Sequence, residues 1–407
     1  MPPRALDIAV IGAGPAGLAL ALHAARVLPQ ARISLFDRRD VTQDVSGDPR
    51  TLALSLGSVQ LLQRLQAWPQ DAAQPILEVH VSQAPPTLTT AGPLAALAAP
   101  EVRILARDEG VPMLGAVLRY GQLVAPLQQA WLQAAARAPQ RLTTRFGSTV
   151  AALKPLQDGT GGVELDAGIA ERFDLAVIAE GGVFAQQARK ALASDYGQTA
   201  WVGTATLQGG APGLAVERFT RHGPLALLPL PPLPEAAPGT RQAALVWCVR
   251  SDDDPVRSLD TAQRQAVLTT LLPEPAGRIR GLSPLKDFAL GLNAERTLVQ
   301  GRSVRIGNAA QTLHPVAGQG LNLGLRDAFE LVQVLRHAVD IDAALQRVEW
   351  ARAADRWSMI AATDFLARSF TWQLPGLAAA RGLGLAALQA AGPLKSRLAR
   401  QMMFGSR

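Results

Sequence analysis

The stretch from Asp7 to Asp37 constrains the fold of this chain more than any other. Its first residues, Asp7 to Ile11, are typical of a buried strand, and an apolar helix pattern follows until Pro29. Between strand and helix stands a GxGxxG arrangement made by Gly12, Gly14 and Gly17. A second strand then leads to Asp37, about 20 residues after the last glycine, where a dinucleotide fingerprint places its ribose-binding acid. Together these features predict a dinucleotide site, but they do not choose between FAD and NAD.

A second glycine-bearing stretch, RIGNAAQTLHPVAGQGLNLGLRD, runs from Arg305 to Asp327 and indicates strand, loop and helix. Gly318 and Gly320 allow a backbone to approach a ligand closely. The helix opening near Leu321 and Asn322 leaves N–H groups unpaired, and such an end attracts partial negative charge. The N1 and C2 carbonyl edge of a flavin carries that charge. The alternative interpretation is an ordinary glycine-rich loop before a core helix.

This second stretch resembles the second flavin motif of the class A flavoprotein aromatic hydroxylases. Most of that class begin the motif with Gly-Asp, whereas this chain has Gly307 and Asn308, followed by Leu313, His314 and Pro315. That form is similar to the ubiquinone-biosynthesis branch. Residues 217–224 and 244–248 are similar to the hydroxylase that acts on 2-polyprenyl-6-methoxyphenol. The resemblance covers most of the chain.

The resemblance implies FAD as cofactor, with its ADP half at the first glycine turn and its isoalloxazine at the second. It also implies O2 as co-substrate and hydroxylation of a polyprenylated phenol through a C4a-hydroperoxyflavin. Arg50 would contact the pyrophosphate or ribityl region, with a surface ion pair to Asp48 as the alternative, and Gln122 would reach the flavin from a helix expected over Gly121 to Arg137. The expected cofactor-binding residues are therefore Gly12, Gly14, Gly17, Asp37, Arg50, Gln122, Glu180, Asn308, Pro315, Gly318, Gly320, Leu321 and Asn322.

The segment after the strand expected at Leu175 to Ile178 departs from the family pattern. Most of these hydroxylases carry Asp-Gly and then a serine there, in contact with both FAD and a nicotinamide cofactor. This chain has Glu180, and Phe184 stands near the serine position. Glutamate keeps the charge, but phenylalanine removes a hydroxyl that would bind pyrophosphate. The electron donor is accordingly expected to be NAD(P)H or a ferredoxin-type protein.

His314 is the candidate catalytic residue, because loss of the phenolic proton assists attack by a phenol and the histidine lies beside the expected flavin. A loop histidine that only hydrogen-bonds to backbone is the alternative. Flavin hydroxylases need few acids or bases, since the cofactor carries the chemistry. The sequence contains no metal-ligand spacing and no GxxxxGK loop.

The expected fold is α/β: a Rossmann-like FAD-binding domain interleaved with a mostly antiparallel-sheet substrate domain and followed by C-terminal helices, as in para-hydroxybenzoate hydroxylase. We assign residues 1–75, 101–195 and 297–340 to the FAD-binding domain, 76–100 and 196–296 to the substrate domain, and 341–407 to the helical region. Strands expected over Val150 to Leu156, Gly162 to Leu165 and Leu175 to Ile178 would complete the first sheet. The short runs of alternating apolar and polar residues after Tyr196 indicate the antiparallel sheet of the substrate domain.

The composition and the charge pattern limit the classes of partner that this chain is expected to bind. Charged residues make 18%, and the net charge of +7 is not arranged in a basic run with interleaved aromatics, so nucleic acid is excluded as a partner. The single cysteine, Cys248, rules out an internal disulfide and suits a cytoplasmic location. The stretch Gly376 to Met403 mixes apolar and basic residues, which fits peripheral contact with the inner face of a membrane, another ubiquinone-biosynthesis protein, or a helix closing the core.

Two functional alternatives stay open: a sister hydroxylase acting at another ring carbon, and a flavin-binding scaffold with little turnover.

Overall fold

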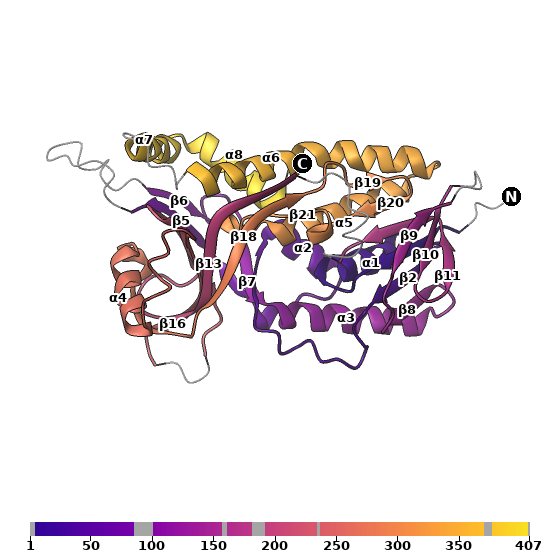
Figure 1. Ribbon diagram of the computed structural model, residues 1–407, viewed down its shortest axis with the longest axis horizontal. Helices are drawn as coiled ribbons and strands as arrows, with labels where there is room; N and C mark the ends of the chain where they lie inside the picture. Colours follow the sequence, from indigo (N-terminus) through magenta and orange to yellow (C-terminus); the bar gives the residue numbers. More distant parts are fainter. Residues whose placement is uncertain are drawn as a thin grey trace.

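A computed structural model of the chain describes residues 5–84, 101–156, 161–180, 192–233, 237–369 and 377–405. One half of the molecule is built on a six-stranded sheet with the order β19-β20-β12-β1-β2-β8 (Figure 1). All neighbours are parallel except β19 and β20. The strands are β1 (Asp7–Ile11), β2 (Arg32–Asp37), β8 (Leu142–Phe146), β12 (Leu175–Ile178), β19 (Val299–Gln300) and β20 (Ser303–Arg305).

Both faces of this sheet are apolar and both are covered. Side chains alternate along a strand, so Ile8 and Val10 of β1 point to one face and Ala9 and Ile11 to the other. The first face packs against helices α1 (Pro15–Val27), α3 (Tyr120–Arg137) and α5 (Gly320–Arg336). The second face packs against a separate antiparallel sheet of β9 (Ala152–Pro155), β10 (Val163–Asp166) and β11 (Ala170–Phe173).

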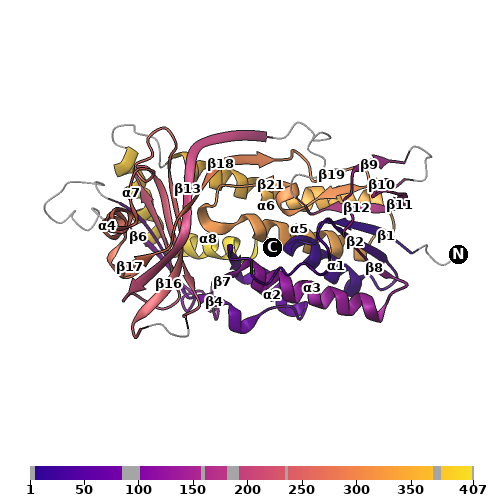
Figure 2. The same cartoon turned by 60° about the horizontal axis from the view of Figure 1, so that its bottom comes forward.

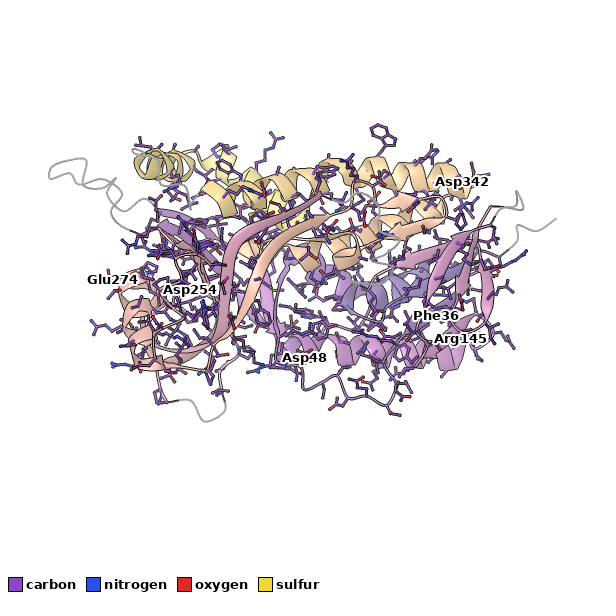
Figure 3. All side chains as sticks on the ribbon, viewed as in Figure 1. Phe36, Asp48, Arg145, Asp254, Glu274 and Asp342 are labelled. Atoms are coloured by element: carbon purple, nitrogen blue, oxygen red, sulfur yellow. The ribbon has the colours of Figure 1, made fainter. Side chains whose placement is uncertain are left out.

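That small sheet corrects one expectation. The strands expected over Val150 to Leu156 and Gly162 to Leu165 do not extend the main sheet, and only β12 does. The physical reason is that α1, α3 and α5 share one face, which leaves Ala9, Ile11 and Phe36 in need of a cover on the other. Phe36, labelled in Figure 3, meets Phe173 of β11 edge to face at 6.0 Å.

The other half of the molecule is a nine-stranded, mostly antiparallel sheet with the order β21-β18-β13-β16-β15-β14-β5-β6, in which β17 pairs with β13 (Figures 1 and 2). Its one parallel pair in the described residues is β14 with β5. One face packs on α4 (Thr261–Leu271) through Trp201, Trp247 and Leu268. The strands are β5 (Glu78–Gln83), β6 (Glu101–Leu105), β13 (Leu192–Gln208), β14 (Leu214–Thr220), β15 (Gly223–Leu230), β16 (Thr240–Arg250), β17 (Arg278–Leu282), β18 (Lys286–Ala294) and β21 (Gln311–Thr312).

Smaller elements connect the halves. A three-stranded sheet of β3 (Thr51–Ser55), β7 (Gly115–Arg119) and β4 (Gln74–Ile76) leads into α2 (Leu56–Arg64). The long helix α6 (Ile341–Ser369) runs along the top of Figure 1, and α7 (Leu377–Ala390) and α8 (Gly392–Phe404) follow it. None of the described helices combines the length and the apolar character that a membrane crossing demands. Single turns of 3-10 helix are η1 (Gln70–Ala72), η4 (Glu274–Ala276), η5 (Gly307–Ala309) and η6 (Val316–Gly318).

The expected α/β class with a Rossmann-like sheet, an antiparallel sheet and C-terminal helices is confirmed. The two sheets are interleaved along the chain, because β5 and β6 come before β12 but pair within the nine-stranded sheet. Residues 101–105, which we assigned to the FAD-binding domain, form β6 of that sheet.

Candidate cofactor-binding site

The first glycine turn lies between β1 and α1. The Gly12 N–H donates to the Phe36 carbonyl at 2.7 Å, and the φ of Gly12 is +104°, a conformation that side chains disfavour. A Cβ on Gly17 would collide with the carbonyl oxygen of Gly12, so helix and strand approach each other as closely as backbones can. Gly14 precedes the helix without a side-chain cap. The first N–H groups of α1 are therefore available to an anion, which fits the pyrophosphate of a dinucleotide.

Asp37 fastens this turn from the end of β2. Its buried carboxylate accepts a hydrogen bond from the Ala13 N–H at 2.6 Å and from the Arg39 N–H at 2.8 Å. The Arg39 guanidinium also donates to Asp37 at 3.0 Å and to the Ala13 carbonyl at 2.7 Å. The expected ribose-binding acid thus stands at the turn and also shapes it.

Arg50 and Gly14 are linked through a residue that sequence reasoning missed, Tyr120. The Arg50 guanidinium lies 4.1 Å from the centre of the Tyr120 ring, and the Tyr120 hydroxyl lies 3.7 Å from where a Cβ on Gly14 would be. Arg50 is also paired with Asp48 at 2.7 Å and is largely exposed, as in the alternative role considered for it. Tyr120 opens α3, and only its position directly after a strand signals it in the sequence.

Glu180, two residues after the end of β12, packs against the first glycine turn. Its Cβ lies 2.8 Å from the position a Cβ on Gly12 would take, and its carboxylate is 3.3 Å from the Arg38 guanidinium. Burial raises the pKa of Glu180, and the nearby Arg38 charge opposes that rise. Phe184 lies outside the described residues. Gln122 is exposed on the first turn of α3.

The second glycine stretch meets the first at α1. Gly307 and Gly324 are so close that a Cβ on Gly324 would lie 2.7 Å from the Gly307 Cα, and a Cβ on Gly307 would lie 3.4 Å from the Cβ of Ala16. Ala16 belongs to the first turn of α1. Two stretches about 300 residues apart in the sequence thus share one contact, as a single cofactor spanning both would require.

Asn322, in the first turn of α5, connects the second glycine stretch to β3 and α2 through hydrogen bonds. Its side-chain oxygen accepts hydrogen bonds from the Ser55 N–H and the Ser58 hydroxyl, both at 2.8 Å. Its amide donates to the carbonyls of Ala53 at 3.1 Å and Gly318 at 3.0 Å. The side chain is therefore committed to the protein, which leaves the backbone N–H groups of α5 as the donors that a flavin would meet.

The other expected residues of this stretch surround that helix end. Gly318 has a φ of +59°, lies against Ala53 and ends the 3-10 turn η6, which Pro315 directly precedes. α5 begins at Gly320 and has no side-chain cap. Gly320 and Leu321 are half-buried, and Asn308 is exposed on η5. The uncapped start of a 17-residue helix suits the electron-rich edge of a flavin.

His314 is buried with both ring nitrogens in use. Its Nδ1 accepts from the Val316 N–H at 3.2 Å, so its Nε2 carries the proton and donates to the Gln198 side-chain oxygen at 3.1 Å. Burial lowers the pKa of His314 to about 4. These contacts favour the alternative role weighed for this residue, a loop histidine that hydrogen-bonds to backbone, over that of a catalytic base.

Replacing His314 with asparagine is expected to make the protein less sensitive to acid. The folded pKa of about 4 lies below the unfolded value near 6.5, so stability is complete above pH 6.5 and is lost as pH falls towards 4. The histidine should account for about 2 kcal/mol of the loss between pH 7.5 and pH 5. Urea unfolding at both pH values measures this difference in the free energy of unfolding. Burial also lowers the pKa of His23 to about 4, so replacing His23 with asparagine is a matched second test. If the asparagine variant and the parent lost the same stability between pH 7.5 and pH 5, the lowered pKa of His314 would be contradicted.

Comparison with known proteins supports a flavin site. A family model described as "FAD binding domain" matches residues 237–363, which include the second glycine stretch. The chain is 31% identical to the ubiquinone hydroxylase UbiL of Rhodospirillum rubrum over 98% of its own length and 90% of the relative. It is 30% identical to the 3-demethoxyubiquinol 3-hydroxylase of Escherichia coli, with 96% of each covered.

Solved structures agree on the fold. A variant of HpxO from Klebsiella pneumoniae in complex with FAD matches with a TM-score of 0.69 at 16% identity, covering 98% of this chain and 99% of the other. The p-nitrophenol 4-monooxygenase PnpA of Pseudomonas putida matches with a TM-score of 0.69 at 12% identity and 99% coverage of both chains.

Proposed function

The chain belongs to the FAD-dependent aromatic hydroxylases of ubiquinone biosynthesis, and from that premise we propose that it hydroxylates the ring of a polyprenylated phenol, as the 2-polyprenyl-6-methoxyphenol hydroxylase does. The observation that carries this proposal is the meeting of the two glycine stretches at Ala16, Gly307 and Gly324. FAD supplies the oxygen chemistry when bound. The glycines at both turns would hold it at its two ends.

The protein's own task is to position the ring and exclude water. The apolar cluster of Phe219, Val81, Val316 and Leu366 joins the substrate sheet, the second glycine loop and α6. In the proposed reaction this cluster would help to keep solvent from the reacting atoms. It also offers an apolar surface to a prenyl chain.

Purified protein reconstituted with FAD and reduced chemically should hydroxylate a short-chain prenylated phenol when oxygen is admitted. The control is the same phenol with flavin-free protein, and product is measured by mass spectrometry. Protein that is yellow but releases only peroxide would favour the flavin-binding scaffold instead.

The ring carbon distinguishes the second candidate. Similarity to the Escherichia coli 3-demethoxyubiquinol 3-hydroxylase across 96% of the chain favours a sister hydroxylase acting at another position. The quinone intermediate that accumulates in a strain lacking the gene would decide between them. A 6-methoxyphenol precursor would favour the first candidate, and a demethoxyquinone the second.

We also propose that the electron donor is either NAD(P)H or a ferredoxin-type protein. The second choice is motivated by the altered segment from Glu180 to Phe184, in which phenylalanine stands near the position of the family's serine. Anaerobic bleaching of the flavin by NADPH alone, compared with bleaching by a ferredoxin and its reductase, separates them.

Helices α7 and α8 provide the proposed contact with an anionic membrane surface. Residues 377–405 carry Arg381, Lys395, Arg397 and Arg400 and no acidic residue, and Leu394 and Leu398 are exposed beside Arg397. We expect flotation with vesicles containing anionic lipid and none with zwitterionic vesicles, and loss of binding in high salt. Lys395→Glu with Arg397→Glu should abolish flotation, whereas Arg347→Glu on α6 should not. Equal flotation of both variants would contradict the proposal, and binding to a ubiquinone-biosynthesis protein instead would assign these helices to a protein partner.

A further inference from the structure

The face of the nine-stranded sheet that is turned away from α4 carries a row of half-buried apolar side chains. On the α4 face the side chains are buried, among them Leu245 and Trp247. Because side chains alternate along a strand, Val246 of β16 points to the opposite face. It pairs with Ala226 of β15 and with Val202 of β13, and all three side chains are half-buried. We call these three residues, which lie on adjacent strands, the apolar row.

The second glycine loop crosses the same face beside the apolar row. Val316 of the loop packs in one apolar cluster with Phe219 of β14, whose partner on β15 stands two residues before Ala226. Two residues of a strand span roughly 7 Å, so Phe219 stands in the row of side chains next to the apolar row. The residue opposite Ala226 on β14 is Glu217, so the apolar row begins at β15. A molecule held against the loop would therefore reach the apolar row directly.

On β16 the partial exposure is confined to the apolar row. Ala244, two residues before Val246 on the same face, belongs to a buried cluster with Ala53 of β3 and Val117 of β7. Cys248, two residues after Val246, is buried as well. Val246 thus stands partly exposed between two buried neighbours of its own face.

The apolar row ends at an open edge of the sheet. Val202 pairs with Lys286 of β18, which runs beside β13 through the middle of the molecule (Figures 1 and 2). Among the described residues, β18 has no partner on its outer side over residues 286–290, because β21 pairs only with its last two residues. Phe288, a diagonal neighbour of Val202 on the same face, is 52% exposed. An apolar chain on the row would leave the sheet past this phenylalanine.

We infer that the apolar row binds the prenyl tail of the substrate, which runs from the second glycine loop across Ala226, Val246 and Val202 to Phe288. Three strand spacings separate β15 from β18, roughly 14 Å in all, which is longer than a single isoprene unit. Burial of the tail removes apolar surface from water and so supplies binding energy. The small side chains of the row leave room for the chain. This inference rests on the proposed function and names the surface that selects a prenylated phenol over a phenol without a tail.

The test compares a phenol that carries three isoprene units with the same phenol without them. Each is titrated into oxidised, FAD-loaded protein, and binding is followed by the change in flavin absorbance, without turnover. The parent should bind the tailed phenol roughly 100-fold more tightly, the ratio expected when only part of the tail is buried. Val246→Trp, whose indole would fill the row, should bind both phenols about equally and keep the parent's affinity for the phenol without a tail.

Two further variants locate the path of the tail. Phe288→Ser at the open edge should lower the preference for the tailed phenol about tenfold without abolishing it. The matched control is Ala289→Trp, which adds the same indole to the opposite face of β18, where Ala289 is exposed, and should leave the preference unchanged.

FAD content and melting temperature identify any variant that has lost its fold. Val246→Thr, which has nearly the shape of the parent side chain, keeps the test valid if Val246→Trp does not fold. Its hydroxyl group would have to be buried under the tail, so the preference should fall about tenfold.

The outcomes separate this inference from the proposed function. Equal binding of the two phenols by the parent, or an undiminished preference in the folded Val246 variants, would overturn the inference even if the enzyme hydroxylates. Loss of affinity for both phenols in those variants would place the ring on the apolar row and would overturn it as well. A preference that falls on mutation in a protein that forms no hydroxylated product would leave the tail contact standing and sink the proposed function.

Discussion

Replacing Gly17 with alanine is expected to abolish FAD binding and to destabilise the fold. The added Cβ would overlap the carbonyl oxygen of Gly12, a backbone atom that cannot rotate away. Strand β1 and helix α1 would have to separate, which should cost about 1–3 kcal/mol of stability, and FAD affinity should fall at least 100-fold. Absorbance at 450 nm after reconstitution measures the first effect and urea unfolding the second.

Two further glycines make this prediction specific. A Cβ on Gly14 would meet only the Tyr120 hydroxyl at 3.7 Å, so Gly14→Ala should fold normally and lose FAD affinity because the methyl group stands where pyrophosphate approaches. A Cβ on Gly384 in α7 would meet nothing within 4 Å, so Gly384→Ala should leave both properties intact. Full FAD binding by Gly14→Ala would place the pyrophosphate elsewhere.

Replacing Arg352 with methionine should cost about 3–5 kcal/mol of stability, as breaking a buried ion pair does. Arg352 lies on α6, where it donates to Asp327 of α5 at 2.8 Å. Its Nη2 lies 2.7 Å from an oxygen of Asp355, an ion pair whose angle does not suit a hydrogen bond. The carboxylates of Asp327 and Asp355 are both buried. A second arginine, Arg326, lies 3.4 Å from Asp355. Methionine fills the space but leaves negative charge in an apolar setting.

Arg347→Met is the control, because Arg347 is exposed on the same helix. Urea unfolding of both variants and the parent measures the difference. Arg352→Met should also release FAD more readily, since the pair with Asp327 fixes α5, whose first turn would face the flavin in the proposed site. A loss below 1 kcal/mol, equal to that of the control, would show that the cluster is not a stabilising tie.

The fold followed from local pattern because its two glycine stretches carry strong short-range signals. Strand, GxGxxG and helix over residues 7–27 predicted β1 and α1, and the strand–loop–helix reading of residues 305–327 matches β20, η6 and α5. What local pattern cannot give is which sheet a short strand joins. β9 and β10 carry the alternation of any half-buried strand, and their separate sheet depends on which face the helices leave bare.

The side-chain roles around the site were harder to predict than the backbone. Asn322 stands beside the helix end as expected, yet its four hydrogen bonds run to residues about 270 positions away or one turn back. No sequence pattern encodes such partners. The buried charges of α6 did leave a signal, because Leu345, Val348, Arg352, Asp355 and Met359 recur at helical spacing and are all buried. Charged residues in phase with an apolar stripe indicate a buried ion cluster rather than a solvated face.

Interleaving of the two sheets has a consequence for biosynthesis. A nascent chain that has emerged only as far as β12 contains four of the six strands of the first sheet. The edge of β12 stays unpaired until β20 is translated, more than 120 residues later. Until then that strand edge offers unpaired backbone groups to other chains. Because the proposed flavin site includes the start of α5, this site is complete only after α5 has been synthesised, and newly made protein would then need both chaperones and FAD.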